Sequence, residues 1–363
     1  MATHATYRWT HLRAGRLLLD GGSMFGVVPR VVWTRAIVAD DKNRIELAHN
    51  CLLLERTVPK SVPEVAANAE SERDNDPSTE QAAPISARVP VPQKIIIETG
   101  TGDKLDDKMV SIFGLDGTTV ESALIDAGHT PAHIDMVVVT HLHFDHAGGL
   151  TRRCRTGEKP DWSADESTPV ASPTAAAAVK LTFPNATIHT QLREWNDAIA
   201  NTSVMTLTYY RDHLDPLLIP LVDGRERLIR HDSPRPFHTG YSPKRGELPK
   251  VPISYRETEI APGLTVFLAP GHTWGQQAVK FTDEKNRTIV FVPDVMPSVY
   301  HLGAAYSLAY DVEPYTSMIT RHWLLEEAVR NDWLLFLDHE PGNPLQRVSR
   351  SKKGWYDLTP VEP

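Results

Sequence analysis

One short run near the middle of the chain, Thr140–Gly149, constrains the fold and the chemistry most, because four potential metal ligands lie within six consecutive positions. These side chains are His141, His143, Asp145 and His146. The run follows Met136–Val139, an apolar and mostly β-branched stretch that is typical of a buried strand. Imidazole nitrogens and carboxylate oxygens suit zinc and related divalent ions. Unless three unrelated surface histidines gather here by chance, the spacing predicts a metal site at a strand end.

The cysteine content indicates that this site is catalytic. Only Cys51 and Cys154 occur among 363 residues, without CxxC spacing, so neither a disulfide framework nor a structural thiolate site is expected. A hydrophobic content of 41% is ample for a globular core.

The charge and the hydrophobic pattern exclude other classes of protein. A formal net charge of −8 and a pI near 6.1 argue against nucleic-acid binding, which needs a basic face. No run approaches the roughly 20 apolar residues that cross a bilayer, and the first residues do not resemble a signal peptide. We therefore expect a cytoplasmic protein with no membrane or nucleic-acid partner.

The His-x-His-x-Asp-His spacing after an apolar stretch resembles the signature of the metallo-β-lactamase superfamily. Three later stretches resemble its other ligand segments: Ala269–Thr273, Val292–Asp294 and Leu337–His339. The resemblance implies two divalent metal ions, with zinc as the expected metal. The implied ligands are His141, His143 and His272 for one ion, Asp145, His146 and His339 for the other, and Asp294 as the bridge. Each added ligand follows an apolar, strand-like run, which supports the assignment independently.

Strands alternate with helical patterns, at 106–114 and 118–127 for example, which indicates an α/β fold. The resemblance implies one domain over residues 1–363, a four-layer αβ/βα sandwich with the metals at one edge between two mixed sheets. The stretches 58–93 and 151–180 are rich in small, polar and proline residues, so we expect solvated insertions there. Tyr7–Trp33 alternates short apolar runs with glycine, which predicts strands joined by tight turns.

Two segments bear on the substrate pocket. Asp20–Pro29 resembles the N-terminal segment of the quorum-quenching lactonase branch, and its Met24 and Phe25 either line a pocket or pack in the core. Met205–Ile219, with Trp195 nearby, is the expected cap over the metals, although its aromatic side chains suit core packing equally well. The aromatic and histidine side chains concerned are Trp195, Tyr209, Tyr210 and His213.

The chain departs from the family pattern at two positions. Glu98 stands where an aspartate is usual, so we expect it to support a ligand rather than to bind metal. Many lactonases of the superfamily carry a tyrosine three residues after the bridging aspartate, and this chain has Pro297 there. Tyr300 is the nearest phenol downstream and the predicted donor to the carbonyl oxygen; Tyr210 is the alternative, and core packing is the competing role of Tyr300.

The implied activity is hydrolysis. Two bridged divalent ions lower the pKa of water to about 7, so a bridging hydroxide can attack without a serine or cysteine nucleophile. Asp145, Asp294 and Tyr300 are the predicted catalytic residues, with Asp145 a ligand or a proton shuttle. The resemblance favours opening of lactone rings, N-acyl homoserine lactones above all. A homodimer is the assembly that we consider. The alternatives are an arylesterase or phosphotriesterase, a glyoxalase-type thioesterase, and an iron-dependent oxidoreductase.

Overall fold

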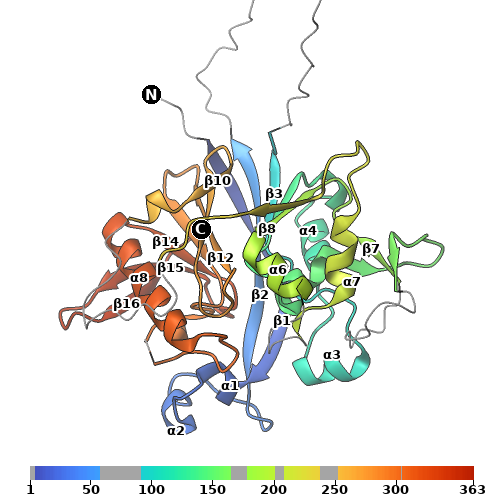
Figure 1. The fold of residues 1–363 in the computed structure, drawn as a ribbon. Helices are drawn as coiled ribbons and strands as arrows, with labels where there is room; N and C mark the ends of the chain where they lie inside the picture. Colours follow the sequence, from blue (N-terminus) through green and yellow to red (C-terminus); the bar gives the residue numbers. More distant parts are fainter. Residues whose placement is uncertain (1–4, 58–90, 165–177, 201–207, 238–251, 304) are drawn as a thin grey trace, which may run out of the picture.

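The computed structural model describes residues 5–57, 91–164, 178–200, 208–237, 252–303 and 305–363. Two mixed β-sheets pack face to face in these residues, and helices cover the outer face of each sheet (Figure 1). Helices α4 (Val120–Asp126) and α6 (Leu192–Ala200) lie on one side, and α8 (Pro314–Asn331) lies on the other. The predicted four-layer αβ/βα sandwich is confirmed.

The first sheet has the strand order β1-β2-β3-β4-β8-β9. Its strands are β1 (Thr6–Asp20), β2 (Arg44–Thr57), β3 (Lys94–Ile97), β4 (Met136–Val138), β8 (Thr187–Gln191) and β9 (Leu228–His231). The pairs from β3 to β9 are parallel, whereas β1, β2 and β3 pair antiparallel. Strand β4 is buried along its whole length, which explains its uninterrupted apolar sequence.

The second sheet has the order β10-β11-β12-β13-β14-β15-β16, and only β13 and β14 pair in parallel. Its strands are β10 (Thr258–Ala261), β11 (Leu264–Leu268), β12 (Gln277–Thr282), β13 (Thr288–Val292), β14 (Leu334–Leu337), β15 (Leu345–Arg350) and β16 (Tyr356–Pro360). A small third sheet contains β5 (Thr151–Arg153), β7 (Ala178–Leu181) and β6 (Trp162–Ser163).

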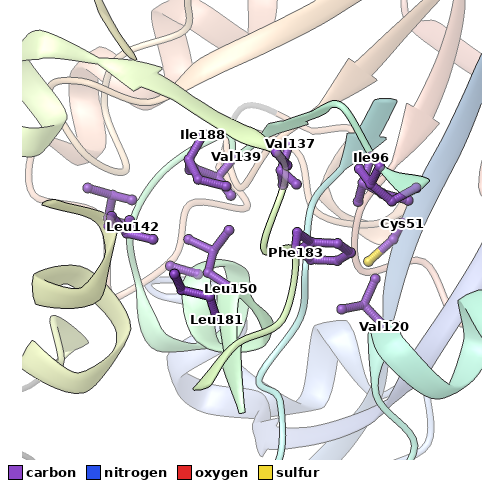
Figure 2. Packing of buried hydrophobic residues seen from close by; sticks show 14 of the residues in the cluster. Cys51, Ile96, Val120, Val137, Val139, Leu142, Leu150, Leu181, Phe183 and Ile188 are labelled. Atoms are coloured by element: carbon purple, nitrogen blue, oxygen red, sulfur yellow. The ribbon is translucent and has the colours of Figure 1, made fainter. Parts of the chain in front are cut away.

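Alternation of side chains along the strands builds three apolar layers. Ile97 faces Phe291 and Phe336 across the gap between the sheets. Ile96 and Val137 point the other way, toward the helices on the first sheet, where Figure 2 shows them with Val120 and Phe183. On the far side, the second sheet packs against α8; the residues there include Val290, Leu335, Trp323 and Leu324. Burial of these layers is the main driving force for the sandwich.

Several short helices lie between the strands. They are α1 (Gly21–Phe25), α2 (Arg30–Trp33), α3 (Asp107–Phe113), α5 (Phe144–Ala147) and α7 (Arg211–Leu214), with 3₁₀ turns η1 (Pro131–His133), η2 (Gly148–Leu150), η4 (Asp215–Leu218), η5 (Ile253–Tyr255) and η6 (Val299–His301). Asp106 caps α3 by accepting from the Met109 amide, and Thr119 caps α4 in a capping box with Ser122. No helix in the described part of the chain is long and apolar enough to cross a membrane.

The first thirty residues differ from the prediction of short strands and turns. They form one strand of 15 residues followed by two short helices. Gly15, with φ +106°, lies at an irregularity in the pairing with β2, so the chain passes through the glycine as a bulge and pairing resumes at Arg16. The apolar runs on both sides of Gly15 therefore belong to the same strand.

The first predicted insertion lies mostly outside the described residues, at 58–90, and the second lies partly outside them, at 165–177. Where the first insertion leaves the sheet, its ends are adjacent, because the Arg56 amide donates to the carbonyl of Gln93 over 2.9 Å. The described ends of the second insertion form strands β5, β6 and β7 instead of irregular chain.

Replacement of residues 58–90 by a short linker should leave a cooperatively folding protein. The junction at Arg56 and Gln93 is already closed by β2–β3 pairing, and loop length changes closure entropy only slowly. Thermal unfolding followed by circular dichroism checks this, with the full chain as control. Insoluble protein, or a broad transition, would show that the segment packs on the body of the protein.

Candidate metal centre

Both sheets contribute side chains to one site. The loop after β4 carries His141 and His143, and the short helix α5 that follows carries Asp145 and His146. The second sheet contributes the remaining three residues from the ends of three strands: His272 after β11, Asp294 after β13 and His339 after β14. All seven predicted ligands are buried and meet at one end of the sandwich.

Three histidines form the first cluster. Nδ1 of His143 lies 3.1 Å from Nε2 of His141 and 3.0 Å from Nε2 of His272. A tetrahedral ion with bonds of 2.0–2.1 Å separates its ligand atoms by about 3.3 Å, so these spacings suit a shared cation. Burial lowers the pKa of His141 and His143 well below the usual value, which keeps both imidazoles neutral with lone pairs available for a metal.

The second cluster joins His146 and His339, whose Nε2 atoms lie 3.2 Å apart. Oδ2 of Asp145 lies 3.8 Å from Nε2 of His146 and 3.7 Å from Nε2 of His339. Asp338 is a further buried carboxylate in this group, and the sequence reasoning did not consider it.

Asp294 lies between the two clusters. Its Oδ2 lies 3.1 Å from Nε2 of His272, and its Oδ1 lies 3.3 Å from Nε2 of His339. Oδ1 is buried without a well-formed hydrogen bond, which is costly for an anion unless a cation compensates it. The types of donor atom, their spacing and the buried oxygen of Asp294 that lacks a well-formed hydrogen bond all fit a pair of divalent ions.

The ring nitrogens of His272 and His339 that face away from the site have partners as well. Nδ1 of His272 lies 3.0 Å from Oδ1 of Asp311, and Nδ1 of His339 donates to the Ala48 carbonyl over 2.8 Å. These contacts orient Nε2 toward the site. Glu98 takes the supporting position expected from the sequence, because its Oε2 lies 3.4 Å from Nδ1 of His146 while its Oε1 accepts from the Thr140 amide.

A cavity of about 210 Å³ opens over the two clusters. Its walls are mainly apolar or aromatic and its floor consists of metal-site residues. The lining residues are Leu19, Met24, Met109, Phe113, Phe144, Thr208, Tyr210, Leu308 and Tyr310 on the walls and His143, Asp145, His272, Asp294 and His339 on the floor. The wall contains no lysine or arginine among the described residues, so the site suits an uncharged substrate group.

Met24 and Phe25 have different surroundings in the structure. Met24 lines the cavity, whereas Phe25 stacks between Trp33 and His301, with ring centroids 5.2 and 5.0 Å away. Each of the two roles that the sequence left open therefore applies to one of these neighbours.

The side chains of the expected cap also differ in their surroundings. Tyr210 lines the cavity, but Tyr209, Trp195 and His213 are buried in the body of the protein. Residues 205–207 of the cap lie outside the described residues.

Three aromatic rings form one wall of the cavity. Phe144 stacks on Phe113 at 5.1 Å between centroids and on Tyr210 at 5.7 Å. Phe144 belongs to the His-x-His-x-Asp-His run itself, so the wall is fixed to the metal ligands on either side of it. Stacking of this kind packs the three rings into one aromatic wall.

Tyr300 is partly buried against the cluster that contains Phe25 and Trp33. It is not among the described residues that line the cavity, whereas Tyr210 and Tyr310 are. Sequence reasoning missed Tyr310 as a donor, although it directly precedes Asp311, the partner of His272. It also missed Glu194, a buried carboxylate beside the three-histidine cluster. The only signal for Glu194 in the sequence was its position at the start of a predicted helix.

Comparison with known proteins supports this geometry. A family model described as the Metallo-beta-lactamase superfamily matches residues 93–339, more than half of the chain. The sequence matches none of the curated proteins at a significant level.

Solved structures show the same fold over the whole chain. A probable metal-dependent hydrolase from Staphylococcus aureus is 21% identical, with a TM-score of 0.64 and 99% of each chain covered. AidC, a dizinc quorum-quenching lactonase in complex with a product, is 17% identical, with a TM-score of 0.57, 99% of this chain and 98% of AidC covered. The hydrolase AbOPH in the beta lactamase superfamily is 16% identical, with a TM-score of 0.59, 100% of this chain and 99% of AbOPH covered.

Proposed function

Because the chain belongs to the metallo-beta-lactamase superfamily and is a metal-dependent hydrolase, we propose that it opens lactone rings, with N-acyl homoserine lactones as substrates and zinc as the metal. The observation that carries this proposal is the position of Asp294, with one oxygen near each cluster, under an apolar cavity. The floor supplies hydrolytic chemistry and the walls accept an uncharged acyl group.

The predicted ligands form two sets, one for each metal ion, with one shared residue. His141, His143 and His272 would hold one ion, Asp145, His146 and His339 the other, and Asp294 would bridge them. Two bound divalent ions would lower the pKa of water and polarise the scissile carbonyl.

Asp145 combines two roles in this proposal. It faces the cavity and also lies within 3.8 Å of His146. It can therefore accept the proton of the attacking hydroxide and pass it to the departing alkoxide. A phenol at the cavity wall would donate to the carbonyl oxygen; Tyr300 is the donor predicted from the sequence, and Tyr210 and Tyr310 line the cavity. The apolar walls would bind the acyl chain.

The neighbours add support at the level of similarity. AidC is described as a dizinc lactonase in complex with the product N-hexanoyl-L-homoserine. That protein and this chain share a fold across almost their whole lengths.

An arylesterase or phosphotriesterase is the second candidate. The stack of Phe113, Phe144 and Tyr210 offers an aromatic wall that would suit an aryl leaving group. A glyoxalase-type thioesterase is less well supported, because no basic side chain among the described lining residues would bind the carboxylates of glutathione. An iron-dependent oxidoreductase would use most of the same ligands, and quantification of bound metal with oxygen-uptake measurements distinguishes it.

A panel of substrates tests the proposal on zinc-loaded protein. We expect kcat/KM to be highest for N-hexanoyl-L-homoserine lactone, compared with p-nitrophenyl acetate and paraoxon. Removal of the metal by a chelator should abolish turnover, and added zinc should restore it. Turnover of the ester or the phosphotriester without lactone opening would refute the substrate assignment and leave the metal site intact.

A homodimer and a cytoplasmic location stay predictions from the sequence. Small-molecule esters or lactones are the proposed partners, and this proposal does not depend on the oligomeric state.

A further inference from the structure

Glu194 lies in the first turn of α6 and its side chain is fully buried, with no exposed surface. Oε1 accepts hydrogen bonds from the Leu142 amide at 3.0 Å and the Tyr209 hydroxyl at 3.2 Å. Oε2 accepts from Oγ1 of Thr273 at 2.6 Å. It does not line the cavity, so it does not meet the substrate directly.

Two of these donors flank ligands of the three-histidine cluster. Leu142 lies between His141 and His143, and Thr273 directly follows His272. The first segment leaves one sheet and the second leaves the other. A single carboxylate therefore joins the two segments that must meet to form this cluster.

We propose that Glu194 is a positioning residue that holds the three-histidine cluster in its metal-binding arrangement and, through Tyr209, ties the cap to that cluster. This inference rests on the proposed function in one respect, since it supposes that the cluster binds a metal ion. It does not depend on which substrate is hydrolysed.

The hydrogen bonds favour the ionised form of Glu194. All three partners donate, and a carboxylate can only accept, so an ionised side chain satisfies them all. Burial raises the pKa of Glu194, while the bonds from Thr273, Leu142 and Tyr209 lower it. A buried anion next to the cluster would be stabilised by a cation bound there.

Close packing fixes the carboxylate in place. Gly275, three residues after His272, lies against the backbone of Glu194, and a Cβ at that glycine would come within 2.2 Å of the Glu194 nitrogen. The ring of Tyr209 lies 5.0 Å from the ring of His143. The first turn of α6 and the ring of Tyr209 therefore pack directly against segments that carry the cluster.

Metal affinity is the quantity to measure. Glu194→Gln keeps the shape but places an NH₂ among three donors, so we expect the affinity for the zinc ion at the three-histidine cluster to fall by roughly 10- to 100-fold. Competition with a chromophoric chelator, using zinc alone, gives the affinity. The visible spectrum of the cobalt-substituted protein should also change, because the geometry of the three-histidine cluster changes.

Asp197→Asn is the matched control. It makes the same acid-to-amide change on the same helix, where Asp197 pairs with Arg193 at 2.7 Å near the surface. We expect wild-type zinc affinity and an unchanged cobalt spectrum in this variant.

Two gentler variants test the inference if Glu194→Gln does not fold. Thr273→Val and Tyr209→Phe each remove one donor and leave Glu194 in place, and each should weaken zinc binding by a few-fold to about tenfold, on the scale of one hydrogen bond. Wild-type zinc affinity in Glu194→Gln, or in both of these variants, would overturn the proposal. Lower stability of the metal-free protein with unchanged zinc affinity would do the same, since it would identify a role in folding alone.

The result is independent of the substrate assignment. If the wild-type protein binds two ions but does not open lactones, the proposed function fails and the role of Glu194 can still be confirmed. If lactones are opened and Glu194→Gln binds zinc normally, the role of Glu194 fails and the proposed function stands.

Discussion

Replacement of Asp294 by alanine should lower lactone hydrolysis by roughly 10³-fold or more, because both clusters lose the carboxylate that lies between them. Oδ2 lies beside the three-histidine cluster and Oδ1 beside His339, so one carboxylate contacts both groups. Two histidine clusters without this shared anion would bind two cations less tightly and farther apart. We therefore expect fewer than two zinc ions per chain in the variant.

Kinetics with N-hexanoyl-L-homoserine lactone and metal quantification on the same sample check this result. Asp223→Ala is the control, since Asp223 pairs with its exposed neighbour Arg225 and is not among the described residues of the metal site or the cavity. Asp294→Asn separates charge from shape, and its activity should stay low because an amide cannot bridge two cations as a carboxylate does. Full activity in Asp294→Ala would show that the proposed metal mechanism is wrong.

The second large effect concerns the phenol beside the substrate carbonyl. We expect Tyr310→Phe to lower kcat by about 10²–10³, the usual loss when a donor to a developing oxyanion is removed. Tyr310 lines the cavity together with His272 and Asp294, and the adjacent Asp311 holds His272 in place. Burial raises the pKa of Tyr310, so its hydroxyl keeps the proton that it donates.

Tyr210→Phe and Tyr300→Phe, measured in parallel, identify the donor. A loss of this size in Tyr300→Phe alone would support the assignment made from the sequence, and a loss in Tyr210→Phe alone would place the donor on the cap. Tyr255→Phe makes the same change at a side chain that is 77% exposed, and should behave as the wild type. Unchanged kcat in Tyr310→Phe, Tyr210→Phe and Tyr300→Phe would mean that no phenol assists the reaction.

Local sequence was sufficient to locate the strands that carry the ligands. The apolar runs 264–268 and 288–292 coincide with β11 and β13, and the run 333–337 begins one residue before β14. A strand that is buried on both faces must be apolar throughout, and polar residues directly after it mark the point where the chain leaves the sheet. The strand ends can therefore be recognised from short segments, whereas His272, Asp294 and His339 were added through the resemblance to the superfamily.

The opening segment shows the limit of such patterns. A glycine between two apolar runs is compatible with a turn or with a bulge, and the choice depends on the neighbouring strand. Here β2 pairs with residues on both sides of Gly15, so the backbone hydrogen bonds of one continuous strand outweigh the tendency of glycine to form a turn.

Apart from Glu98, the supporting residues could not be identified from the sequence. Asp311 lies 39 residues from His272, and Glu194 lies 52 residues from Leu142 and 79 from Thr273. An aspartate or glutamate has the same local signal whether it faces solvent or orients an imidazole, since that difference depends on what surrounds it after folding. Met24 and Phe25 differ for the same reason, because the direction of each side chain is set by how the short helix α1 packs.

The sequence by itself determined the residue types of the predicted ligands and the strand ends at which they lie: the spacing of one run indicated the first four, and the resemblance to the metallo-β-lactamase superfamily added His272, Asp294 and His339. Only the tertiary structure decided that Asp311 lies beside His272, that Glu194 accepts hydrogen bonds from the segments of Leu142 and Thr273, and that Tyr310 lines the cavity. Those relations join segments that lie far apart in the sequence, and their distances are set by how the chain packs in three dimensions.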